Sequence, residues 1–496
     1  MTIEEVLALE DIDKKVYYLK KGRRTLAPDV KRLWEDWNPD LHEIIIDKDK
    51  YPKIKITTEP EKQVYDESTN RTLTQERKTK DVEPNRIALP IEQDIINIQT
   101  AFTVGNEPKM TCEPSDDGER KVLTVINQIL KTNKIKYQNK KVVRSWLSEQ
   151  ECAEYWYAAE DNGFWDKLKS KIKELFGKKP EKRLRSVLWS PFRGDKLYPF
   201  FNDNGDMVAF SREYKKKDLD GNKTVCFMTI TKDKVYNWEL AADWLQKSVF
   251  SHGFRKLPVI YSYRPEGYCD KIHTIRVRLE KLLSEYGDCI DYHFFPILLF
   301  FCDEMPNLSG DMRNRIAQLS GEGANASYLT WQQVPDTVKY EAESLINLMY
   351  SLTSTPRISF DYLIGKGNAV SGESFKYMFM GAHMAVANHA EVIGDFMQRR
   401  INFLVSAVGS QNTYLEKASN TIDIGVDIQP YMIDNIGDKV ATAVNAVSGG
   451  VWSRREGISF CGNAERMDEE LRDIEDDSKK KAERTKNEDT PAGAAN

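Results

Sequence analysis

Residues Gly365–Val408 read GKGNAVSGESFKYMFMGAHMAVANHAEVIGDFMQRRINFLVSAV, and this stretch decides the fold. From Phe375 onward its apolar residues recur every three or four positions, the period of an α-helix, and no proline follows before Pro430. The hydroxyl of Ser371 is placed to cap the first turn by accepting a hydrogen bond from a free backbone N–H. The pattern therefore predicts a helix of about 37 residues, roughly 55 Å long, that spans its domain.

A glycine-rich loop, Gly365–Gly372, precedes this helix. The N-terminus of a helix presents free N–H groups and the positive end of the helix dipole, which suit a phosphate group. The loop is not a nucleotide-binding P-loop, because Lys366 stands near its start and is followed by Gly367 instead of Ser or Thr. Two interpretations remain open: a mobile structural loop, or a site for a small phosphate compound.

The composition limits the classes of protein to consider. The chain has 496 residues, of which 40% are apolar and 30% charged, and its net charge is -5, so it is not a dedicated basic nucleic-acid binder. Met1–Glu10 is acidic and lacks an apolar run, so we expect no signal peptide and synthesis in the cytoplasm. The longest apolar run, Phe294–Cys302, is too short to cross a bilayer and predicts a buried strand, so no membrane partner is expected.

The sequence has no pattern typical of a metal site or an active site. The 7 cysteines include no CxxC pair, which argues against a disulfide framework or a zinc knuckle. Cys269 with His273 and Cys289 with His293 are each spaced by four, but on one helix the two pairs would lie about 30 Å apart. The 6 histidines form no cluster, and neither a catalytic triad nor a metal-spaced carboxylate pair is present. We therefore expect no metal, no cofactor and no enzymatic activity.

The remaining patterns predict an α+β fold that is mainly α. Before the long helix we expect, in chain order, a capped helix from Thr2 to about Leu19, short strands at Ile44–Ile46 and Lys53–Thr57, an exposed loop from Glu59 to Pro84, a helix beginning at Pro90, helical structure over Gly118–Asp161, a basic amphipathic helix at Trp165–Arg185 and a β-meander over Ser186–Tyr236. The basic segment is either a solvated surface insertion or a site for membrane or nucleic acid.

Two further helices, Asp270–Tyr292 and Asp336–Leu352, enclose a small insertion. Its expected elements are a strand at Ile297–Cys302, a helix at Asp311–Leu319 and a strand at Ser327–Trp331. After the long helix, the segment IDIGVDIQPYMI, residues 422–433, predicts one more strand.

Three segments are the most specific parts of this order of elements. They are HGFRKLPVI at residues 252–260, GNAVSGESFKYMF at 367–379, and VSGGVWSRREGISF with NAERMDEELRDIEDD between 447 and 477. Together with the order of elements, they resemble the portal proteins of tailed bacteriophages, of the long-tailed siphophage type. The resemblance covers roughly Pro84–Asp477.

The resemblance implies a ring, usually of twelve subunits, at one capsid vertex of a virion. Double-stranded DNA would pass through the central channel without sequence readout during packaging and ejection. The implied partners are the terminase packaging motor, head-completion or adaptor and tail proteins, and the major capsid and scaffolding proteins.

The resemblance also implies a division of the chain. It gives an N-terminal arm (1–83), a β-rich wing (84–267), a stem helix (268–293), a small α/β clip (294–335), a second stem helix (336–353), a tunnel loop (354–371), the long helix with the return strand of the wing (372–433), a helical crown (434–485) and a disordered tail (486–496).

The same resemblance assigns candidate site residues. The DNA-facing tunnel loop would hold Arg357, Lys366, Asn368 and Ser371, of which the last two are better suited to loop and cap roles. The stem would present the basic residues Lys271, Arg276, Arg278, Lys281 and Lys339. The clip would bind partner proteins through Asp303, Glu304, Asp311 and Glu322. The alternatives are an enzyme that uses Gly365–Gly372 to bind phosphate and a scaffold of helices without a channel.

Overall fold

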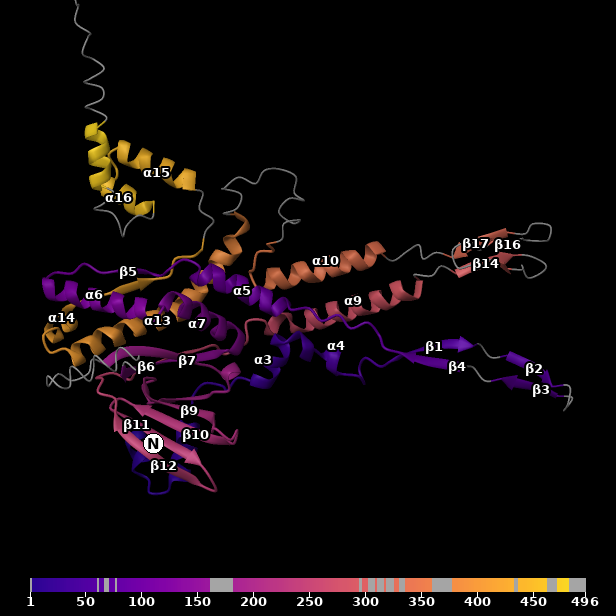
Figure 1. Cartoon of the computed structure of the whole chain (residues 1–496), viewed down its shortest axis with the longest axis horizontal. Helices are drawn as coiled ribbons and strands as arrows, with labels where there is room; N and C mark the ends of the chain where they lie inside the picture. Colours follow the sequence, from indigo (N-terminus) through magenta and orange to yellow (C-terminus); the bar gives the residue numbers. More distant parts are fainter. Residues whose placement is uncertain are drawn as a thin grey trace, which may run out of the picture. The chain divides into compact units, whose positions relative to one another are not determined.

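The computed structural model describes residues 2–59, 62–66, 71–75, 78–160, 182–293, 297–301, 308–309, 316–317, 325–329, 335–358, 377–431, 436–461 and 471–480. These fall into two compact units (Figure 1). The first comprises Met1–Tyr362 with Met380–Tyr431, and the second comprises Leu363–Phe379 with Met432–Asn496. The fold is α+β and mainly α, as predicted.

The long helix α13 (Met380–Gln411) is the main strut of the first unit. It has 32 residues, about 48 Å of helix, and residues from Ala382 to Gly409 along it are buried. It packs against α5 (Ile91–Val104), α6 (Asp117–Thr132) and α14 (Glu416–Thr421). The predicted long helix is therefore confirmed from Met380 onward, while its predicted cap at Ser371 lies outside the described residues.

Two antiparallel sheets stack beside this helical layer. The predicted meander is confirmed as a five-stranded sheet of β8 (Lys196–Phe201), β9 (Met207–Lys217), β10 (Lys223–Thr231), β11 (Lys234–Leu240) and β12 (Trp244–Ser251). The second sheet has the order β13 (Val259–Tyr263), β6 (Glu151–Glu160) and β7 (Lys182–Trp189). Trp189, Phe210 and Tyr261 pack together in the core between the two sheets.

The helical prediction over Gly118–Asp161 is right only up to Glu149. After α6, helix α7 (Ile135–Glu149) ends where Gln150 adopts a left-handed φ of 66°. The chain then forms β6, whose residues pair with β13 on one side and β7 on the other. Both faces of β6 are buried, because Cys152 and Trp156 pack in the core with the helices while Ala153 packs in the core between the two sheets. Its sequence therefore lacks the alternation that identifies a half-buried strand.

The N-terminal predictions need three corrections. The first predicted helix is two helices, α1 (Ile3–Ala8) with the expected Thr2 capping box and α2 (Ile12–Lys21), because Asp11 accepts from Lys14 N–H and starts a new helix. The strand predicted at Ile44–Ile46 is the last part of helix α4 (Glu43–Ile46), which contacts helix α9 (His273–His293). The strand predicted at Lys53–Thr57 is confirmed as β1 (Ile54–Glu59). The predicted loop after it instead holds three strands: β4 (Lys78–Val82), which pairs with β1, and β2 (Lys62–Asp66), which pairs with β3 (Arg71–Gln75). Polar Lys and Thr side chains give these strands no apolar alternation, which explains the missed prediction.

Helices α9 (His273–His293) and α10 (Pro335–Leu352) confirm the two helices predicted around the insertion. Within the insertion, β14 (Ile297–Phe301) pairs with β17 (Asn325–Leu329), as both predicted strands require. The helix predicted at Asp311–Leu319 is wrong at Ile316–Ala317 (β16), whose backbone pairs with Leu308–Ser309 (β15).

The second unit contains α15 (Ile436–Ser448), α16 (Arg454–Phe460) and a helical segment at 471–480. Ser453 caps α16 by accepting a 3.1 Å hydrogen bond from Glu456 N–H. Gly457 lies against Val447, where a Cβ would come within 2.8 Å of the valine side chain, so glycine lets the two helices approach closely.

Candidate functional site

Helices α9 and α10, which we call the stem pair, run antiparallel and lie side by side (Figure 1). Just before α9, the Tyr268 hydroxyl donates a 2.5 Å hydrogen bond to the Thr353 carbonyl, which follows the end of α10. Farther along α9, Arg278 donates to Glu341, near the start of α10, at 2.8 Å. The insertion between residues 293 and 335 therefore connects the ends of two helices that already lie together.

An extended segment, Asn85–Leu89, is laid along one face of α9. Three of its backbone N–H groups donate to α9 side chains spaced by four: Asn85 to Asp288 at 2.7 Å, Ile87 to Ser284 at 2.9 Å, and Leu89 to Glu280 at 2.9 Å. Two residues of extended chain rise about 6.6 Å and four residues of helix rise about 6 Å, so the spacing of the N–H donors matches the spacing of the side-chain acceptors. This match holds the chain against the stem helix without a sheet partner.

The base of α9 contains a buried group of charged residues, which we call the stem-base cluster. It consists of Asp36, His42, Glu92, His273, Arg276 and Glu280. Arg276 lies at its centre, is 2% exposed, and forms ion pairs with Asp36 at 2.8 Å, with Glu280 at 3.2 Å and with Glu92. The cluster joins the helices that carry Asp36 and Glu92, α3 (Val30–Trp37) and α5, to the stem.

Two histidines, His42 and His273, contact the carboxylates of the stem-base cluster. Nδ1 of His42 lies 2.6 Å from Glu280 Oε1, and its Nε2 lies 3.1 Å from the Asp36 carbonyl oxygen. Both ring nitrogens of His42 are thus within hydrogen-bond distance of an oxygen atom of the cluster. His273 donates from Nδ1 to Asp36 at 2.9 Å, and this hydrogen bond raises the pKa of His273.

Burial raises the pKa of Glu92 to about 7, even though the charge of Arg276 opposes this shift. Burial also acts to raise the pKa of Asp36, but the hydrogen bond from His273 and the charge of Arg276 outweigh it and the pKa is lowered. One buried carboxylate of the stem-base cluster thus titrates near neutral pH while its neighbour remains ionised.

The five basic stem residues predicted to face DNA lie in different environments. Arg276 is buried and paired inside the subunit, so we do not propose it as a DNA-facing residue. Arg278 is half exposed and paired with Glu341, and Lys281 lies 3.7 Å from Glu285. Lys339 is exposed, while Lys271 lies outside α9 at the edge of a pocket.

The tunnel-loop prediction is described only in part. Arg357 donates a 3.3 Å hydrogen bond to Asn347 Oδ1 on α10. The other predicted loop and clip residues lie outside the described residues: Lys366, Asn368, Ser371, Asp303, Glu304, Asp311 and Glu322. The alternative phosphate site at Gly365–Gly372 also lies outside them.

Gln99 is a positioning residue that the sequence interpretation missed. Its buried amide nitrogen lies within hydrogen-bond distance of Thr353 O (3.2 Å), Ser354 O (3.1 Å) and Thr355 Oγ1 (2.9 Å). Ser354 has a left-handed φ of 49°, a conformation unfavourable for a residue with a Cβ. Gln99 therefore fixes the sharp turn by which the chain leaves α10. Little in the sequence signalled this role, because half of the residues of α5 are polar.

A second buried ion pair anchors the long helix. Arg400 of α13 donates from Nε to Glu154 at 2.7 Å and from Nη1 to Asn139 at 2.6 Å. Burial raises the pKa of Glu154, although the adjacent Arg400 charge opposes the shift. The pair joins α13 to β6 and α7 within the core.

The described part of the chain contains no group of three or more His, Cys, Asp or Glu residues arranged to hold a metal ion. Cys269 and His273 do not act together on one ligand, because the His273 ring is hydrogen-bonded to Asp36. None of the described helices is both long and apolar enough to cross a membrane.

Comparison with known proteins identifies the family. A solved structure described as "Neck of empty GTA particle computed with C6 symmetry" matches 75% of this chain and 90% of that chain, with 10% identity and a TM-score of 0.39. No curated protein matches the chain. The family described as "Phage portal protein, SPP1 Gp6-like" matches residues 31–484, which is nearly the whole sequence. The chain therefore belongs to the SPP1 Gp6-like family of phage portal proteins.

Proposed function

We propose that this portal protein forms a closed ring, with twelve copies, at one vertex of a phage capsid, and that double-stranded DNA passes through its central channel during packaging and ejection. The observation that carries the proposal is the portal-family match over residues 31–484. The stem pair and the insertion at its tip support it, because they follow the order that the family resemblance predicts.

Exposed apolar side chains support assembly into a ring. Tyr340 and Leu348 on α10 and Met380 and Met384 on α13 are large apolar residues that the single subunit leaves exposed. Apolar surface of this kind favours contact with another chain. A head-to-tail contact between copies closes into a ring when its rotation permits.

The ring is tested by negative-stain microscopy and mass photometry of the purified chain. We expect closed rings at micromolar concentration and moderate salt, with a mass that corresponds to twelve subunits. A monomer under these conditions, or an open filament, would contradict the proposal.

The loop 354–371 is proposed to narrow the channel and face DNA. Arg357 and Lys366 supply one charge each per subunit, so weak screened contacts with phosphates would repeat around the ring. The alternative is that both cations pair with acidic neighbours such as Asp361 and Glu373. The double variant Arg357→Ala/Lys366→Ala should change the length or the retention of packaged DNA in an otherwise competent virus. Unchanged packaging and retention, with the ring intact, would remove the loop from the mechanism.

The clip 294–335 is proposed to dock the packaging motor and the head-completion proteins, because it is a small module between the two stem helices. A subunit without the clip should still assemble but lose both partners in pull-down assays. Retained binding of both partners would refute this assignment. Capsid and scaffolding proteins are proposed as further partners of the assembled ring.

A further inference from the structure

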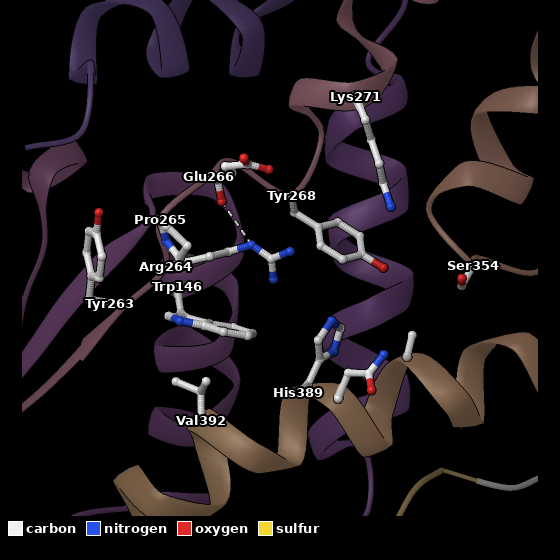
Figure 2. A pocket seen from close by; sticks show the side chains of 12 residues that line it. Trp146, Tyr263, Arg264, Pro265, Glu266, Tyr268, Lys271, Ser354, His389 and Val392 are labelled. Carbon is white, nitrogen blue, oxygen red and sulfur yellow. Dashed lines mark hydrogen bonds between the residues drawn. The ribbon is translucent and has the colours of Figure 1, made fainter. Parts of the chain in front are cut away.

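A pocket of about 350 Å³ opens in the first unit beside α7 and α13 (Figure 2). The chain between β13 and α9 forms one wall, and the other walls come from α7, α13 and the turn after α10. This volume is near the lower end of the usual range for ligand pockets. Its polar lining residues include Arg264, Lys271, Asn388 and His389.

Arg264 brings a positive charge to this pocket without a carboxylate partner. Its guanidinium lies 5.2 Å from the centre of the Trp146 ring and 5.0 Å from that of Tyr268. Its Nε donates to the Glu266 carbonyl oxygen at 2.9 Å, while the structure gives its two terminal nitrogens no ion pair with a carboxylate of the described residues. Figure 2 shows the guanidinium directed into the space between Trp146, Tyr268 and His389.

Lys271 adds a second cation to the same pocket. Its ammonium lies 5.6 Å from the centre of the Tyr268 ring, and it too has no ion pair among the described residues. Burial lowers the pKa of Lys271, and the nearby charge of Arg264 lowers it further. Burial likewise lowers the pKa of Arg264. Glu266 also lines the pocket, but it forms no ion pair with either cation. Two cations that share a partly enclosed space without an ion-paired carboxylate are stabilised by a bound anion.

The hydrogen bonds of His389 determine which of its ring nitrogens carries the proton. The Thr103 hydroxyl donates to the Gln99 carbonyl at 2.7 Å, so its oxygen accepts from His389 Nδ1 at 3.1 Å. Burial lowers the pKa of His389 to about 3, so the ring is neutral and its single N–H is on Nδ1. Its Nε2 therefore carries a lone pair that accepts a hydrogen bond.

We propose that this pocket binds a free phosphate ion in a form that retains a proton. Arg264 and Lys271 bind the charged oxygens, and the P–OH group donates to His389 Nε2. Sulfate and the phosphodiesters of DNA carry no such proton at neutral pH, so they leave the His389 lone pair facing an acceptor. The remaining volume accommodates the water molecules that surround a small ion.

Isothermal titration of the full chain with potassium phosphate at fixed ionic strength tests this site, with potassium chloride as the reference. We expect saturable binding of phosphate. Lys271→Met and Arg264→Gln should each weaken it about tenfold or more, because each removes a charged donor. The matched control Lys247→Met removes an exposed cation of β12 that pairs with Glu239, and it should leave the affinity unchanged.

The preference for a protonated anion is tested by titrating sulfate and a short DNA duplex with 5′-hydroxyl ends. Both should bind at least about tenfold more weakly than phosphate, and His389→Leu should reduce the difference between phosphate and sulfate. If His389→Leu does not fold, the comparison of phosphate with sulfate on the unaltered chain decides. Absence of saturable phosphate binding by the unaltered chain, or an affinity in both cation variants equal to that of the unaltered chain, would overturn the site. Equal affinity for sulfate or for the duplex would overturn the role of His389.

Discussion

Replacing Arg276 with methionine is expected to destabilise the base of the stem by about 3–5 kcal/mol, the usual cost of removing one partner from a buried ion pair. The guanidinium is 2% exposed and forms ion pairs with Asp36, Glu92 and Glu280. Methionine fills a similar volume but removes the cation that those three carboxylates share. The loss is large beside the total stability of a domain, which is about 5–15 kcal/mol.

The size of this loss should depend on pH. Burial raises the pKa of Glu92 to about 7. At pH 5 Glu92 is therefore protonated in the folded protein, and it is the uncharged one of the three acidic residues around Arg276. At pH 8 Glu92 is ionised in the folded protein, so the missing cation costs more. We therefore expect Arg276→Met to be more damaging at pH 8 than at pH 5.

Hydrogen exchange is the suitable assay, because a chain with two units need not unfold in one step. Backbone amides of α9 and α3 should exchange faster in Arg276→Met. The control is Arg278→Met, two residues along the same helix, whose exposed pair with Glu341 should contribute less than about 1 kcal/mol. Equal protection of α9 in the two variants would refute the role of the stem-base cluster.

Three further changes test other parts of the core and the stem. Raising the pH from 5 to 8 should destabilise the stem base by up to roughly 3 kcal/mol. The reason is that the pKa of Glu92 is 4.5 in the unfolded chain and about 7 in the folded chain, so only the folded chain holds the proton between these values. Glu92→Gln should reduce this pH dependence in denaturation curves. Arg400→Met should cost about 3–5 kcal/mol in thermal unfolding, because Glu154 stays buried without its cation. Gln99→Leu should cost about 1–3 kcal/mol and make the turn at Ser354 more sensitive to protease, because it removes the buried donor of that turn.

Periodicity alone predicted the elements that form the frame of the molecule. In Met380–Gln411 and in the stem helices, apolar residues recur every three or four positions over a longer stretch than a strand or loop occupies. The meander is identified by its turn residues, Asn204-Gly205 and Asp220-Gly221. Gly205 and Gly221 both adopt positive φ, at 89° and 85°, which explains why glycine stands at these turns. Local pattern and tertiary structure agree in these elements.

Local pattern could not reveal the stem-base cluster. Asp36, Glu92 and Arg276 lie far apart in the sequence, and each is typical of the polar face of an amphipathic helix when considered by itself. Only the packing of three helices shows that these polar faces meet one another instead of water. The backbone contacts of Asn85–Leu89 with α9 were equally hidden, because an extended segment on a helix has no periodicity of its own.

The ion pairs of the stem bear on how DNA would move past it. Arg278 and Lys281 each lie beside a carboxylate, Glu341 and Glu285, so these exposed positions carry little net charge. If the stem faces DNA, as the family resemblance implies, a phosphate that approaches either cation also meets an acid, and the contact is weak and screened by salt. An array of unpaired cations would instead hold the duplex at every phosphate and resist its passage. At Arg278 and Lys281, the pairing with neighbouring acids therefore favours a surface along which DNA slides over one that holds it.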